Sequence, residues 1–182
     1  EFWFAPPELT QGHAGTGNIF VRLAAGDAGA TVTIDMPANP GALNSGSPIT
    51  VVLAANESQT VSLTSFINIL ETRPQATVLS TGLHITATEE ITAIYEAGPN
   101  FNVDIWALKG TNGLGTEFYV PMQNLWPNGG YTPIAYSSFD IVATEDNTTI
   151  LIYPTSDLDL PNGTDGAAGG EPAFQSFTIT LN

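Results

Sequence analysis

Glu117-Phe118-Tyr119-Val120-Pro121-Met122 is the stretch that decides how this chain is organised, because the chain begins with a near copy of it, Glu1-Phe2-Trp3-Phe4-Ala5-Pro6-Pro7. The two stretches start 116 residues apart, and residues 20–37 likewise resemble residues 139–154. An internal repeat of about 116 residues is the simplest account. We therefore expect a first unit at residues 1–116 and a second, incomplete unit at residues 117–182.

Short β-type runs separated by Gly, Pro, Asn and Asp predict an all-β chain. In the first unit these runs are residues 2–5, 18–24, 30–36, 49–55, 59–63, 77–79, 83–86, 91–95 and 102–108. In the second unit they are residues 117–122, 139–143, 149–153 and 174–181. Many short strands at regular spacing indicate two tandem β-sandwich-like units.

Three pairs of neighbouring runs are interpreted as hairpins: 18–24 with 30–36, 49–55 with 59–63, and 139–143 with 149–153. Residues 65–73 leave two alternatives open, because Phe66, Ile69, Leu70 and Arg73 recur at helical spacing within an otherwise β-type chain. A short helix and an irregular connection are both compatible with this segment.

The run at residues 174–181 corresponds to residues 50–56 of the first unit. Its expected partner, the counterpart of residues 59–63, would lie beyond Asn182. We therefore expect the second unit to be truncated and open along its last strand. Other domains, or copies of the same protein, are the expected partners through strand pairing at that edge.

The charge of the chain excludes several classes of function. Three Lys and Arg residues stand against 18 Asp and Glu, for a net charge of −15, so neither nucleic acid nor an anionic membrane is an expected partner. The absence of cysteine excludes thiolate chemistry, and no apolar run is long enough for membrane insertion. With 18 Gly and 13 Pro between β-type runs, the composition is typical of secreted bacterial surface proteins, which places the chain outside the cell or at its surface.

One acidic loop is a candidate calcium site. Asp157, Asp159, Asn162 and Asp165 supply oxygen ligands within a single Gly-bearing stretch, as calcium requires. The spacing is not that of an EF-hand and the closing Glu is missing, so a solvated acidic loop is the alternative. No other cofactor is expected.

A second loop, rich in Pro and Gly, carries aromatic and amide side chains. Trp126 and Tyr131 can form a stacking platform for sugar rings, with Asn128 supplying hydrogen bonds, which would make surface glycans a partner. The alternative is that these aromatic residues cap the end of the second sandwich.

The sequence contains few residues that could support histidine-based catalysis. His13 and His84 are the two histidines, and no G-x-S-x-G nucleophile motif is present. A hydrolase is therefore the most distant of the functional hypotheses.

Three stretches carry a family resemblance through their order and spacing: residues 82–95, 103–120 and 138–154. The most specific piece is residues 114–119 followed by residues 141–149. Together they resemble the N-terminal domain of the IgG Fc-binding protein family, which also occurs in bacterial surface proteins of the Bacteroidota type. The resemblance implies an all-β extracellular module of adhesion-type proteins with no catalytic set to transfer. The absence of cysteine departs from animal members and favours a bacterial owner.

The leading hypothesis is therefore a non-catalytic extracellular surface module for cell adhesion or for building an extracellular fibre. The alternative is a carbohydrate-binding module of a secreted protein. Antibody binding does not follow from the resemblance, because a shared fold does not carry function with it.

Overall fold

The computed structural model describes residues 1–8, 18–74, 77–98, 103–121, 138–155 and 175–181. These residues form antiparallel sheets together with one four-residue α-helix, α1 (Ile67–Leu70). The expected all-β class is therefore confirmed.

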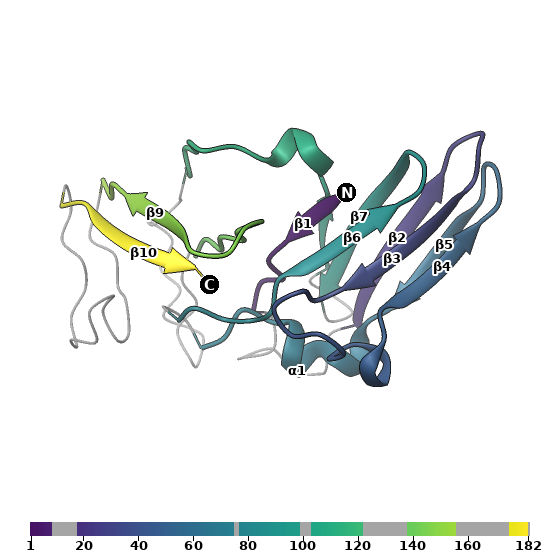
Figure 1. Ribbon diagram of the computed structural model, residues 1–182, viewed down its shortest axis with the longest axis horizontal. Coiled ribbons are helices and arrows are strands. Elements are labelled where there is room, and N and C mark those ends of the chain that lie inside the picture. Colours follow the sequence, from purple (N-terminus) through teal and green to yellow (C-terminus); the bar gives the residue numbers. More distant parts are fainter. Residues whose placement is uncertain (9–17, 75–76, 99–102, 122–137, 156–174, 182) are drawn as a thin grey trace.

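The first unit is a sandwich of two four-stranded antiparallel sheets (Figure 1). The first sheet has the order β1-β6-β3-β4 and comprises β1 (Phe2–Phe4), β6 (Leu83–Ala87), β3 (Ala30–Asp35) and β4 (Ile49–Leu53). The second sheet has the order β5-β2-β7-β8 and comprises β5 (Ser58–Ser62), β2 (Asn18–Ala25), β7 (Ile91–Gly98) and β8 (Asp104–Ala107).

The core lies between these sheets because apolar residues alternate along each strand. Val21 and Leu23 of β2 are buried, with the exposed Arg22 between them. Val32 and Ile34 of β3 are buried likewise, and Thr31 before them is exposed. Successive side chains of a strand point to opposite faces, so each strand gives one face to the core and one to solvent. The rest of the buried set comes from inward positions of the strands, from α1, and from Met36, Leu43 and Leu63 in the connections between elements.

The predicted hairpins of the first unit are wrong. β2 pairs with β5 and β7, whereas β3 pairs with β4 and β6, so these neighbours in sequence lie in opposite sheets. The same holds for β4 and β5 and for β6 and β7. Each connecting turn is therefore an arch, by which we mean a turn that joins strands of opposite sheets. Hairpins and arches both bury alternate residues, so the apolar pattern cannot distinguish them.

Hydrogen bonds join the arches to one another. The backbone amide of Asn56 donates to the carbonyl oxygen of Gly26 at 2.9 Å, and the amide of Ala25 donates to the carbonyl of Glu57 at 2.9 Å. At the third arch, Thr88 accepts a bond from the Thr31 amide through Oγ1 at 3.0 Å. Polar backbone groups at the end of the sandwich are thus satisfied between arches rather than within hairpins.

Gly29 is the position in the first arch where a side chain is least tolerable. Its φ is +70°, and a Cβ built there would lie 2.7 Å from the carbonyl oxygen of Leu53. We expect Gly29→Ala to lower the free energy of unfolding by about 1–3 kcal/mol, through backbone strain and steric overlap. Urea unfolding measures this effect. Gly26→Ala, with no atom within 4 Å of its Cβ, is the matched control, and equal stability of the two variants would contradict the prediction.

Glu57 fixes the second arch. Its carboxylate accepts a hydrogen bond from the Ala54 amide at 2.7 Å and another from the Gln59 side chain at 2.9 Å. The first of these bonds, aided by the second, lowers the pKa of Glu57 below its usual 4.5. A lowered pKa in the folded state means that this stabilisation is present above pH 4.5 and is lost as pH falls through the folded value.

We therefore expect Glu57→Gln to destabilise the chain at pH 7 more than at pH 3. The free energy of unfolding in urea is measured for the variant and the wild type at both pH values. Subtracting one chain from the other at each pH removes the effect of pH on the titratable groups that both chains contain. Glu90→Gln, an exposed carboxylate at the third arch, serves as the control. A Glu57→Gln difference that is the same at both pH values would refute the assigned bonds.

Three further expectations concern local structure. Residues 65–73 do contain a short helix: a 3-10 turn (Thr64–Phe66) leads into α1, which buries Ile67 and Leu70. Residues 77–79 and 139–143 were expected to be strands and are not, and neither is the described part, 117–121, of the expected strand 117–122. The predicted hairpin of residues 139–143 with 149–153 is therefore also wrong. Residues 139–143 are instead placed against the first unit, where Val142 lies beside Gly82 and Asp140 shares a hydrogen bond with Thr72.

The described part of the second unit is a two-stranded antiparallel sheet of β9 (Thr148–Ile152) and β10 (Phe177–Leu181). Figure 1 shows this sheet to one side of the first sandwich. Among the described residues, β10 pairs with β9 alone. A second sandwich-like unit that is truncated and open at its last strand stays a prediction.

Candidate functional site

The aromatic segment Glu117–Val120, here called the EFYV segment, is exposed and belongs to no strand. The exposed fractions are 65% for Phe118, 89% for Tyr119 and 54% for Val120. The contacts of this segment are local: the Tyr119 hydroxyl donates to Glu117 Oε1 at 2.9 Å, and Phe118 lies over Gly115. Three consecutive exposed apolar side chains are an unusual surface, and such surfaces mark interaction sites.

The copy of this segment at the N-terminus is β1, and it is fully engaged. β1 pairs with β6 through Phe2 with Ile85, Trp3 with His84 and Phe4 with Leu83. The Phe4 ring lies 4.7 Å from the Tyr95 ring, centre to centre, within the core. The two similar sequences thus differ in structure: β1 is a strand because the edge of β6 lies beside it, and the EFYV segment belongs to no strand.

His84 is the centre of a polar group on the outer face of the first sheet. The ring stacks on Trp3 at 4.0 Å with an interplanar angle of 19°. Nε2 faces the Glu1 carboxylate at 3.3 Å, and Nδ1 faces the Asp35 carboxylate at 3.5 Å. A protonated ring would donate to both carboxylates and tie β1, β6 and β3 together. His84 is therefore a packed strand residue.

β8 forms one border of the second sheet and joins the first sandwich to the rest of the chain. Trp106 turns inward, where its ring lies 6.0 Å from Phe4 and 5.8 Å from Tyr95. Ile105, which points the other way, is 63% exposed. Among the described residues no strand pairs with the outer edge of β8, so its backbone groups on that side face outward.

The β9–β10 sheet has an apolar face that is incompletely covered. This face carries Ile150, Ile152, Phe177, Ile179 and Leu181, all half-buried. The comparable β3–β4 pair buries its apolar face fully: the cross-strand pair Val32 and Val51 is 0% and 8% exposed. The β9–β10 sheet thus resembles one layer of a sandwich whose opposite layer is missing from the described part.

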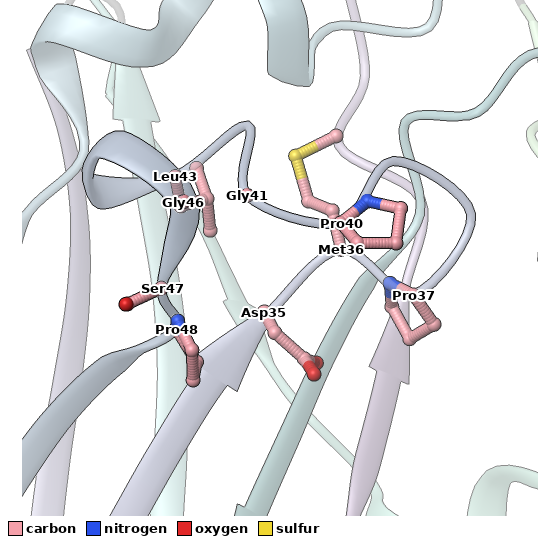
Figure 2. A pocket seen from close by; sticks show the side chains of 9 residues that line it. All are labelled: Asp35, Met36, Pro37, Pro40, Gly41, Leu43, Gly46, Ser47 and Pro48. Carbon is pink, nitrogen blue, oxygen red and sulfur yellow. The ribbon is translucent and has the colours of Figure 1, made fainter.

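A shallow hollow of about 180 Å³ lies beside the loop that follows β3 (Figure 2). Asp35 and Ser47 are the polar side chains of its lining. The other lining residues are apolar side chains, prolines and glycines: Met36, Pro37, Pro40, Gly41, Leu43, Gly46 and Pro48. The lining contains no histidine or lysine that could activate the Ser47 hydroxyl. The hollow therefore supplies no activating base for Ser47 from its own histidine or lysine side chains.

The candidate residues chosen from the sequence lie outside the described part of the chain. This applies to the calcium candidates Asp157, Asp159, Asn162 and Asp165, and to the sugar-platform candidates Trp126, Asn128 and Tyr131. Both sites stay predictions. Within the ranges that the structure does describe, no three or more His, Asp or Glu side chains are grouped so as to hold a metal ion.

Comparison with known proteins bears on the C-terminal part. Residues 106–182 match the IgGFc binding protein family. No curated protein and no solved structure matches the chain. The IgGFc-binding match begins inside β8, at Trp106, and includes the EFYV segment and both strands of the β9–β10 sheet. It supports the resemblance at the level of the family.

The described residues contain no helix long and apolar enough to cross a membrane.

Proposed function

We propose that this chain is a non-catalytic extracellular surface module that acts in adhesion or in building an extracellular fibre. The family matched by residues 106–182 is described as a binding protein, which supports binding over catalysis. The acidic composition, with a net charge of −15, agrees with a soluble extracellular surface that does not bind phosphate backbones.

The observation that carries the proposal is the half-covered β9–β10 sheet. A two-stranded sheet is marginally stable by itself, and further strands or a covering layer are needed to make it persist. Its five apolar side chains, and the edge of β10 with which no described strand pairs, therefore offer a binding surface for strands from another domain or chain. Strand addition of this kind is a general way to build adhesive and fibrous assemblies.

The direct test uses beads coated with the full chain. We expect such beads to cluster with one another, and the clustering to increase with salt, because salt screens the repulsion between chains that each carry −15. Beads coated with an unrelated protein of similar net charge are the control. Absence of clustering at every salt concentration, together with absence of fibres by electron microscopy, would refute the proposal.

Charge on β10 should block this association. Thr178 and Thr180 are exposed on the face opposite to the apolar one, so Thr178→Asp with Thr180→Asp leaves the apolar contacts in place. We expect this double variant to reduce bead clustering at least tenfold, because charges on an edge strand disfavour pairing with another chain. Thr92→Asp with Ser65→Asp adds the same charge at exposed positions of the first unit. Equal loss in both double variants would show that net charge alone is responsible.

The carbohydrate-binding alternative depends on Trp126, Asn128 and Tyr131, which lie outside the described residues. No described feature favours it.

A further inference from the structure

We propose that the EFYV segment is a donor strand that docks onto the β6 edge of a second copy of this chain, in the place that β1 occupies in the structure. This inference rests on the proposed function, because it names the partner and the surface through which copies associate. β1 shows how such a strand is held on this edge.

The β6 edge holds β1 through three kinds of contact. The first is the backbone ladder of three residue pairs, from Phe2 with Ile85 to Phe4 with Leu83. The second is the stacking of Trp3 on His84, to which Glu1 adds its carboxylate 3.3 Å from Nε2. The third is the insertion of Phe4 beside Tyr95 and Trp106.

The EFYV segment repeats the chemistry of β1 position by position. Glu117 corresponds to Glu1 and supplies the carboxylate for His84, and Phe118 corresponds to Phe2. Tyr119 takes the place of Trp3, with a ring that can stack on the imidazole. Val120 takes the place of Phe4, as a smaller apolar side chain beside Tyr95. A strand with these four side chains fits the contacts that the β6 edge makes with β1.

The segment is also free to be donated. Its three apolar side chains are exposed, and its hydrogen bond from Tyr119 to Glu117 is internal to the segment. Figure 1 shows the chain leaving the first sandwich after the 3-10 turn η3 (Gly110–Gly113) that lies against β1. The β6 edge of the same chain is occupied, so the available acceptor is an edge in another copy whose β1 has undocked.

Undocking of β1 is the step that regulates the exchange. β1 has three residues, is half-buried throughout and lies at the border of its sheet. A short border strand, held by a ladder on one side only, opens at a lower free-energy cost than the central strands of its sheet. Docking of the EFYV segment then restores the lost backbone pairs and covers the apolar surface that β1 leaves behind.

Disulfide trapping tests the exchange, because the chain contains no cysteine of its own. The register places Glu1 opposite Thr86, one pair beyond Phe2 and Ile85, so Glu117 of a docked copy should face Thr86. Directly opposed residues of an antiparallel pair are close enough for a disulfide. One full-length chain therefore carries Glu117→Cys, and the other carries Thr86→Cys with Phe4→Ala to loosen β1.

We expect the mixed chains to form a disulfide-linked heterodimer. A donor that also carries Phe118→Asp and Val120→Asp should form at least tenfold less of it, because it loses two apolar side chains from the docked strand. An acceptor with its cysteine at the exposed Thr92 of β7 should likewise form at least tenfold less. Equal cross-linking in all three mixtures would overturn the proposal.

A second measurement covers the case in which a cysteine variant fails to fold. A synthetic peptide of residues 116–122 is expected to raise the Tm of the Phe4→Ala chain, by binding the folded state. The same peptide with Asp at positions 118 and 120 should leave the Tm unchanged. No Tm change with either peptide would overturn the proposal.

The two proposals fail separately. Bead clustering without heterodimer formation would reject the donor strand and leave adhesion through the β9–β10 sheet standing. A heterodimer without bead clustering or fibres would support the donor strand and reject the proposed function.

Discussion

Trp106→Ala is expected to lower the free energy of unfolding of the first sandwich by about 2–4 kcal/mol. The side chain is half-buried and packs against the core, with its ring 5.8 Å from Tyr95 and 6.0 Å from Phe4. Truncation removes an aromatic group from a three-ring cluster and leaves a cavity that the rigid sheets cannot close. Urea unfolding followed by far-UV circular dichroism measures the loss.

The neighbouring residue provides the matched control. Ile105 lies on the same strand but is 63% exposed, so Ile105→Ala should change stability by less than about 0.5 kcal/mol. Similar effects of the two variants would mean that β8 is not integrated into the sandwich. The predicted contrast matters for domain organisation, because the family match begins at Trp106 and so includes the last two residues of β8, a strand of the first sandwich.

This overlap bears on the predicted boundary between residues 116 and 117. The second copy of the repeat starts at Glu117, whereas the matched family region starts eleven residues earlier, at Trp106 within β8. If Trp106 is needed for stability of the first sandwich, the IgGFc-binding region and the first unit share β8. A chain divided at residue 105 would then lack the strand that completes the second sheet.

The strands of the first unit were predictable, but their pairing was not. Alternation of Val32 and Ile34 with Thr31 and Thr33 predicts a strand with one buried face, and β3 is that strand. The same alternation is satisfied whether β2 and β3 pair in one sheet or face each other across the core. The information that decides between them is in long-range pairs such as Val21 with Tyr95, which separate the partners by 74 positions.

The candidate site shows a related limit of sequence patterns. The EFYV segment was expected to be a strand because β1 has nearly the same sequence. β1 is a strand since β6 lies beside it, and the EFYV segment has no strand beside it among the described residues. The side chains of a segment make it able to form a strand, and a neighbouring strand decides whether it does. The likeness of the EFYV segment to β1 nevertheless indicates that the segment is able to pair with the same edge of β6.

Arg73→Met is the second variant from which we expect a large effect, a loss of about 3 kcal/mol in the free energy of unfolding. Arg73 Nε lies 3.2 Å from Glu71 Oε2, and the Glu71 side chain is fully buried. The guanidinium also donates to Asn68 Oδ1 at 2.7 Å. Methionine keeps the apolar stem but removes the cation, so a buried carboxylate loses its charged partner. Thermal and urea unfolding at pH 7 measure the effect.

An exposed Arg–Glu pair provides the control for Arg73→Met, because it shows what the loss of an arginine costs when its partner is not buried. Arg22 pairs with Glu96 on the outer face of the second sheet, and its side chain is 47% exposed. Arg22→Met should therefore cost much less than Arg73→Met, because exposed pairs gain little over their hydration. A deficit that is equal for the two variants would mean that burial of Glu71 does not control the stability of this segment.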